Sequence, residues 1–153
     1  MSHPVTIVDA QSRPVDPTRL RHLATHVLDQ LEVPAELELS ITCVDTARIT
    51  ELNEAYLGGT GATDVLAFPI DGPEDVVAGV PGLLGDVVLC PAVAERQAPE
   101  HGRTAAGESD LLLVHGILHL LGHDHADPAE RAEMFALTDA LLAGFATNAA
   151  HLP

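Results

Sequence analysis

The sequence has no lysine and very few aromatic residues. Its seven basic residues are all arginine and face 23 acidic residues, which gives a formal net charge of −16. This balance is typical of an acidic, solvated surface, and it does not predict a nucleic acid or an acidic protein as partner. Because aromatic residues make up only 3% of the chain, aliphatic side chains must build the core.

Cysteine pairs of the C-x-x-C type and long apolar runs are also absent. Cys43 and Cys90 lie in apolar, strand-like segments, which predicts reduced core residues, with a disulfide between them as the alternative. The N-terminal segment has no basic region followed by an apolar run, and no stretch approaches the roughly 18 apolar residues that a membrane helix needs. These features predict a soluble cytoplasmic protein with no membrane partner, folded as one domain over residues 1–153.

Apolar periodicity and turn residues divide the chain into strands and helices. Pro69 near the end of one strand indicates a place at or near a sheet edge. The last helix is expected to begin at the Asp127 cap and to end at Gly144. The expected strands are residues 5–8, 37–44, 65–70 and 84–89, and the main helices are 17–31, 46–56, about 110–121 and 128–143. This order predicts an α+β fold in which helices cover a mixed β-sheet of about four strands.

Four histidines fall within eleven residues of an apolar segment, HGILHLLGHDH, at 115–125. His115 and His119 are one helical turn apart, so they face the same side and could hold one ion. His125 would lie about 15 Å further along the axis of His115 if the helix continued straight. Gly122 can adopt a left-handed conformation that ends the helix and turns the chain back. The spacing therefore predicts a metal site on a long buried helix and the turn after it.

Three imidazoles suit a single Zn²⁺ ion best, although nickel, copper or iron could bind the same set. Three protein ligands leave a fourth position for water, which is typical of a catalytic rather than a structural zinc. Hydrogen-bonded core histidines are the alternative interpretation. Of the remaining residues, His123 could face the solvent, compete for the metal or act as an acid or base. Asp124 could orient a ligand, and either side chain could assist proton transfer.

The ligand spacing equals that of the metzincin proteases, H-E-x-x-H-x-x-G-x-x-H, with one difference. Those enzymes need a glutamate after the first histidine as the general base, and here that residue is Gly116. Peptidase chemistry of this type is therefore disfavoured. Glycine inside a helix costs about 1 kcal/mol relative to alanine, which indicates that space is needed at Gly116.

Three motifs resemble those of the YbeY family of rRNA maturation factors. Residues 115–125 resemble its H-G-x-L-H-L-x-G-Y-D-H, TDVLAFPID (63–71) resembles T-D-V-L-S-F-P, and LGDVVLCP (84–91) resembles L-G-D-I-x-I-x-P. The resemblance covers nearly the whole chain. It implies a metal-dependent, single-strand endoribonuclease that acts in 16S rRNA 3′-end maturation and 70S ribosome quality control. Its partner would be the small ribosomal subunit or a ribosomal protein, and its zinc ligands would be His115, His119 and His125.

Several positions depart from the family pattern. His123 replaces a tyrosine, Ala67 a serine, and Leu57 an arginine that many members carry and that could clamp a phosphate in the cleft. The missing arginine and the acidic charge favour an alternative function, a metal-stabilised ribosome-assembly factor with little or no nuclease activity, whereas the open zinc position favours the enzyme. Asp64 and Asp86, expected at strand ends, could line the cleft or cap a turn.

Overall fold

A computed structural model describes residues 3–123 and 127–150. Four strands form one mixed sheet in the order β1-β2-β4-β3. The strands β1 (Val5–Ala10) and β4 (Gly82–Leu89) both run parallel to β2 (Leu37–Val44), which lies between them. The strand β3 (Val65–Pro69) pairs antiparallel with β4 and forms one edge, as Pro69 indicated. The predicted α+β class is confirmed.

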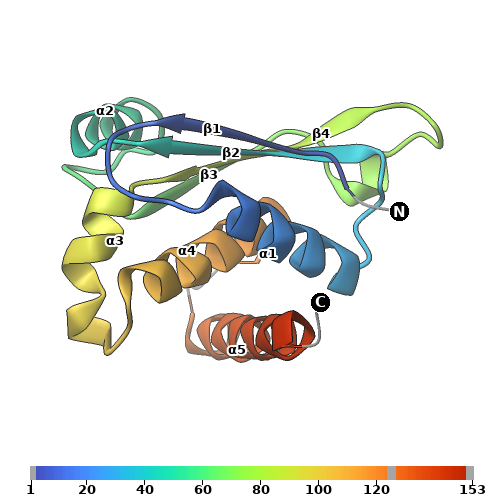
Figure 1. The fold of residues 1–153 in the computed structure, drawn as a ribbon. Helices are drawn as coiled ribbons and strands as arrows, with labels where there is room; N and C mark the ends of the chain where they lie inside the picture. Colours follow the sequence, from blue (N-terminus) through green and yellow to red (C-terminus); the bar gives the residue numbers. More distant parts are fainter. Residues whose placement is uncertain (1–2, 124–126, 151–153) are drawn as a thin grey trace.

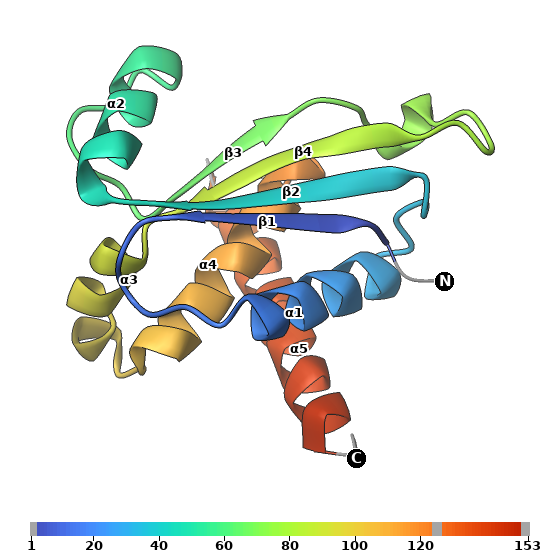
Figure 2. The same ribbon diagram turned by 45° about the horizontal axis from the view of Figure 1, so that its top comes forward.

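Helices cover both faces of this sheet (Figures 1 and 2). On one face lie α1 (Pro17–Gln30) and α4 (Ala105–Leu120), and on the other lies α2 (Thr46–Tyr56). The last helix, α5 (Pro128–Ala150), packs on the side of α4 that is turned away from the sheet, so α4 is enclosed between two layers. The short helix α3 (Pro91–Gln97) connects β4 to the segment before α4. None of the described helices is long and apolar enough to cross a membrane.

Aliphatic side chains build the core, as the shortage of aromatic residues required. Alternate residues of β2 point toward α1 and α4 and are fully or almost fully buried: Leu37, Leu39, Ile41 and Cys43. A smaller cluster that includes Cys90 lies on the α2 side. Both cysteines are buried and free, which confirms the prediction of reduced core residues. Burial raises the pKa of the Cys43 thiol to about 11, so this thiol is inert near neutral pH.

Two helix boundaries predicted from the sequence are wrong. Helix α4 begins at Ala105 rather than near residue 110, because Thr104 acts as the N-cap and its Oγ1 accepts the Gly107 N–H at 3.0 Å. Helix α5 continues through Gly144 instead of ending there. A Cβ atom at position 144 would lie 3.3 Å from His26 Nε2 on α1. This glycine therefore gives room for close helix packing and is not a stop signal.

Gly116 provides the space that the sequence indicated. A Cβ atom at this position would lie 2.6 Å from Cγ1 of Val87 on β4 and 3.3 Å from Cγ2 of Val65 on β3. The glycine thus allows α4 to approach the sheet closely, one residue after His115. The approach sets the distance between the histidine-bearing helix and the edge strand.

Gly116→Ala is expected to destabilise the protein by about 1–2 kcal/mol, although alanine favours a helix by about 1 kcal/mol, because the β-branched Val87 has little freedom to move. The free energy of unfolding in urea measures this change. The double variant Gly116→Ala/Val87→Ala should lose less unfolding free energy than the two single variants lose together. Additive losses would show that this contact does not limit the approach of α4.

Candidate metal centre

The C-terminal half of α4 places two of the predicted ligands on one cavity. His115 and His119 both line a hollow of about 340 Å³. Its other walls come from residues 63–67, at the start of the edge strand β3, and from Arg131 and Phe135 in the first turns of α5. The aromatic ring of Phe135 lies 5.6 Å from the His115 ring, centroid to centroid. The cavity is therefore enclosed by the most buried helix, the sheet edge and the last helix.

The turn after α4 has the conformation that the sequence predicted. Gly122 has a φ of +95°, in the region that favours glycine. Its N–H donates to the His119 carbonyl at 3.0 Å, and the His123 N–H donates to the Leu118 carbonyl at 3.0 Å. These two bonds form the Schellman motif that ends a helix and redirects the chain. His125 and Asp124 lie outside the described residues.

A backbone carbonyl of this turn fixes the tautomer of His119. The Nδ1 atom of His119 lies 3.0 Å from the carbonyl oxygen of His123. Because a carbonyl oxygen can only accept, Nδ1 must carry the proton, and Nε2 carries the lone pair. An imidazole held in this way through its other nitrogen is the usual arrangement of a metal-ligating histidine. The donor set of the cavity wall therefore fits a metal ion that binds imidazole nitrogen.

The described residues supply only part of a coordination sphere. Within 3–123 and 127–150, no three His, Cys, Asp or Glu side chains lie close enough together to hold an ion. The cavity wall contributes two imidazoles, and the proposed third ligand, His125, belongs to the undescribed segment. His123 is half-buried and contributes its backbone carbonyl to His119. The coordination by three histidines and the roles of His123 and Asp124 in proton transfer remain predictions.

A carboxylate also lines the cavity. Asp64 precedes β3, and its Oδ1 accepts the Val65 N–H at 2.8 Å while its Oδ2 accepts a proton of the Gln97 side-chain amide at 2.9 Å. The same Gln97 nitrogen donates its second proton to Oε2 of Glu108 at 2.7 Å. One amide group on α3 thus joins the cavity carboxylate to a second carboxylate on α4. Asp64 both caps the start of the strand and faces the histidines.

The second carboxylate is wholly buried. Glu108 has no exposed surface, and two side chains of the segment before α4 contact its carboxylate. His101 Nδ1 lies 2.9 Å from Oε2, and Arg103 Nη1 lies 3.5 Å from Oε1. A buried carboxylate needs such partners because its desolvation otherwise costs several kcal/mol. Glu108 therefore anchors Gln97, and through it Asp64.

Asp86 does not lie where the sequence placed it. It is in the middle of β4 rather than at a strand end, and it lines a separate hollow of about 290 Å³ on the α2 side of the sheet. Thr42 Oγ1 donates to its carboxylate at 3.2 Å. Burial raises the pKa of Asp86, although the bond from Thr42 opposes this shift. The strand continues past Asp86 because Val87 to Leu89 pair with both neighbouring strands.

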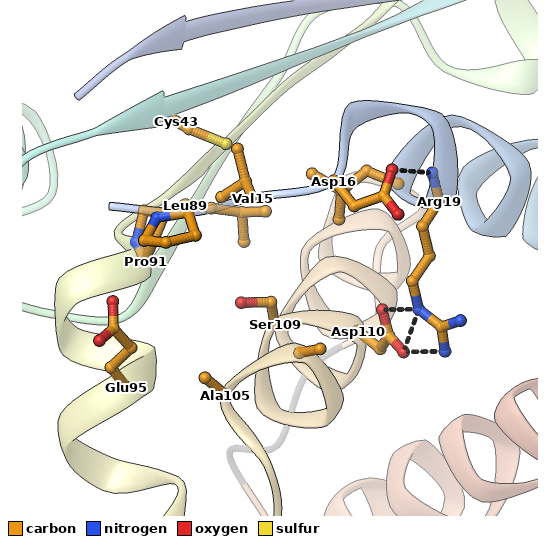
Figure 3. A pocket seen from close by; sticks show the side chains of 13 residues that line it. Val15, Asp16, Arg19, Cys43, Leu89, Pro91, Glu95, Ala105, Ser109 and Asp110 are labelled. Atoms are coloured by element: carbon orange, nitrogen blue, oxygen red, sulfur yellow. Dashed lines mark hydrogen bonds and ion pairs between the residues drawn. The ribbon is translucent and has the colours of Figure 1, made fainter. Parts of the chain in front are cut away.

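A larger hollow, of about 390 Å³, lies at the opposite end of α4 (Figure 3). Its lining is mainly apolar, with Cys43 and Pro91 among its walls. Three charged groups of its lining are already paired: Arg19 Nη2 lies 2.7 Å from Asp110 Oδ2, and Glu95 lies 2.7 Å from Arg13, which is outside the lining. The fourth, Asp16, caps α1 by accepting the Arg19 backbone N–H at 3.1 Å. The histidine cavity, although smaller, is the one that brings metal-binding nitrogens, a carboxylate and an arginine together.

Sequence reasoning missed three residues of this region. Gln97, Glu108 and Arg131 were not expected near the histidines, because each reaches the site from a different element. An acidic residue at the start of a strongly apolar helix was the one available signal for Glu108. Leu57, which replaces the family's arginine, forms the C-cap of α2 and is 48% exposed. Leu57 is not one of the described residues that line the histidine cavity.

Comparisons with known proteins agree on one family. A sequence model of the family described as "Endoribonuclease YbeY" matches residues 6–146. Proteins of that name are similar over most of the chain. The one from Salinispora tropica is 48% identical over 149 residues, covering 92% of this chain and 95% of the relative. The one from Cutibacterium acnes is 46% identical over 144 residues, covering 92% and 93%.

The fold is also found in a solved structure. The solution structure of a Thermotoga maritima protein superimposes with a TM-score of 0.58 and 24% sequence identity, covering 94% of this chain and 93% of the other. At this identity the match supports the fold alone. It agrees with the mixed four-stranded sheet and its covering helices.

Proposed function

The chain belongs to the YbeY endoribonuclease family, and from this premise we propose that it is a metal-dependent hydrolase that cleaves single-stranded RNA. The observation that carries the proposal is the pair of histidines on one cavity wall, with His119 held through Nδ1 by the carbonyl of the turn. A core histidine needs no such cavity, and a structural zinc site would be closed by four protein ligands.

We propose one zinc ion as the cofactor, with His115, His119 and His125 as its ligands. When bound, the ion supplies Lewis acidity for attack of water on a phosphodiester. The Schellman turn at Gly122 supports the third ligand, because it directs the chain back from the axis of α4. Soft thiolate ligands are not involved, since both cysteines are buried elsewhere in the core.

The protein's own residues would orient the substrate and move protons. Asp64 places a carboxylate on the cavity wall, where Gln97 fixes one of its oxygens, so it can accept a proton from water. His123 and Asp124, adjacent to the ligands in sequence, stay predicted participants in proton transfer. Ala67 places only a small side chain on the cavity wall, which leaves room for a substrate.

For the substrate we propose the 3′ end of 16S rRNA, processed in the cytoplasm during ribosome maturation and quality control. A chain with net charge −16 repels a polyanion over most of its surface, so the isolated protein should bind RNA weakly. A partner from the small ribosomal subunit would then deliver the strand. Two free cysteines agree with a reducing compartment.

A second candidate function is a ribosome-assembly factor in which the metal stabilises the fold and little or no cleavage occurs. The observation that favours it is Leu57, since the arginine of many family members is absent at that position. The cavity argues against it, because a purely structural ion needs no open volume beside its ligands.

Single-turnover cleavage of a labelled single-stranded RNA separates the two functions. We expect cleavage by the metal-loaded protein, none after treatment with a chelator, and recovery when zinc is restored. His119→Ala, purified in parallel, controls for contaminating ribonucleases. Small subunits should accelerate cleavage at the 16S 3′ end more than cleavage of an unrelated strand. Equal rates for the wild type and His119→Ala would favour the assembly factor.

A further inference from the structure

One arginine faces the histidine cavity from α5. Arg131 lines the same hollow as His115, His119 and Asp64, and it is the single arginine among the described residues of that lining. Its position in the sequence gave no indication of this, since the turn between α4 and α5 separates it from the histidines. The cavity therefore combines imidazoles, one carboxylate and one permanent positive charge.

Four of the seven arginines are neutralised by carboxylates, and Arg131 is one of the three for which the described residues give no ion pair. The four ion pairs join Arg13 with Glu95, Arg19 with Asp110, Arg48 with Glu51 and Arg103 with Glu108. Arg131 forms no ion pair with a carboxylate of residues 3–123 or 127–150. In a protein with 23 acidic residues, an arginine without a carboxylate partner at a cavity rim is available to a negatively charged ligand.

The position of Arg131 is not explained by helix stability. It lies in the first turn of α5, where the partial positive charge of the helix disfavours a cation. Instead, its guanidinium Cζ lies 5.3 Å above the centroid of the Phe135 ring, one turn further along the helix. That ring in turn lies 5.6 Å from His115. Phe135 thus holds the guanidinium beside the histidine wall, and Arg131 as a residue is exposed.

We propose that Arg131 binds a phosphate of the single-stranded RNA at the histidine cavity. A planar guanidinium donates two parallel hydrogen bonds to phosphate oxygens, which positions the strand beside the histidines. Phe135 is a positioning residue that acts through Arg131. This inference rests on the proposed function, because the phosphate belongs to the RNA that the site would cleave.

Binding of a labelled single-stranded RNA analogue with non-cleavable linkages, measured by fluorescence anisotropy with the metal-loaded protein, tests the contact without cleavage. Arg131→Gln should weaken binding about ten-fold and should lower the slope of log affinity against log salt by about 0.7, the value for one neutralised phosphate. Arg131→Lys should keep most of the slope but lose part of the affinity. Phe135→Leu should have a smaller effect in the same direction.

The matched control is Arg21→Gln, which removes the same charge from an exposed position on α1. It should change affinity by less than about two-fold, because screening weakens distant charges. In cleavage by the metal-loaded protein, Arg131→Gln should raise KM far more than it lowers kcat. Equal effects of Arg131→Gln and Arg21→Gln, or undetectable RNA binding by the wild type, would overturn the proposal. A wild type that binds RNA through Arg131 but does not cleave it would overturn the proposed function alone.

Discussion

Replacing His115 with alanine should remove the bound metal and slow RNA cleavage by about a thousand-fold or more, because the Lewis acid that activates water is lost. His115 lies on a fully packed helix, and its neighbours Val114, Gly116 and Ile117 are buried. No other residue can shift along this helix to replace it. Metal analysis should give near one equivalent of zinc for the wild type and much less for the variant.

Stability provides a second measurement for the same variant. Metal that binds only the folded state raises the free energy of unfolding by about 2.7 kcal/mol at a free concentration one hundred times Kd. Zinc should therefore raise the Tm of the wild type and leave that of His115→Ala nearly unchanged. His22→Ala, an exposed histidine on α1, controls for weak zinc binding at surface imidazoles and should respond like the wild type. Unchanged metal content and Tm response in His115→Ala would contradict the ligand assignment.

Glu108→Ala is expected to cost about 3 kcal/mol of unfolding free energy. The change removes a wholly buried side chain and leaves the Gln97 amide with one acceptor instead of two. It also leaves the Gln97 side chain, which donates to Asp64 on the cavity wall, without its anchor on α4. We therefore expect slower cleavage by the fraction of the variant that remains folded. Urea unfolding with metal chelated measures the stability, and single-turnover rates measure the effect on the site.

Glu108→Gln is the matched variant. It keeps the volume and one acceptor oxygen for Gln97 but removes the negative charge that lies beside Arg103. We expect about half the loss of unfolding free energy that Glu108→Ala causes, because glutamine leaves no cavity and its oxygen still accepts a hydrogen bond from Gln97. If both variants were as stable as the wild type, Glu108 would not anchor this region. Normal stability with slow cleavage would assign Glu108 a role in positioning Asp64 alone.

Local signals were sufficient for most elements and for part of the site. Asp16, Asp45 and Asp127 each accept an N–H from the first turn of a helix, and Asp127 is the cap that the sequence predicted for the last helix. The left-handed Gly122 follows equally from a glycine placed after an apolar helix. In each case the residue that determines where a helix begins or ends lies within a few positions of that helix end.

Contacts between distant segments could not be predicted in this way. Nothing in the local sequence shows that Gln97 would meet both Asp64 and Glu108, because the bridge depends on how α3 packs against α4 and the sheet edge. Gly144 was misinterpreted for the same reason, since the neighbour that explains it, His26, belongs to another helix. Asp86 was placed at a strand end because the length of β4 depends on its pairing with β2 and β3.

Because α4 is enclosed between the sheet and α5, one part of the site tolerates substitution less well than the other. The histidines belong to a helix whose packing on both sides tolerates little change, so an altered ligand there would disturb the core itself. Arg131 and Leu57 lie on exposed surfaces of other elements, where a charge can appear or vanish with little effect on packing. A substitution at Arg131 or Leu57 is therefore expected to disturb the fold less than a substitution at His115 or His119.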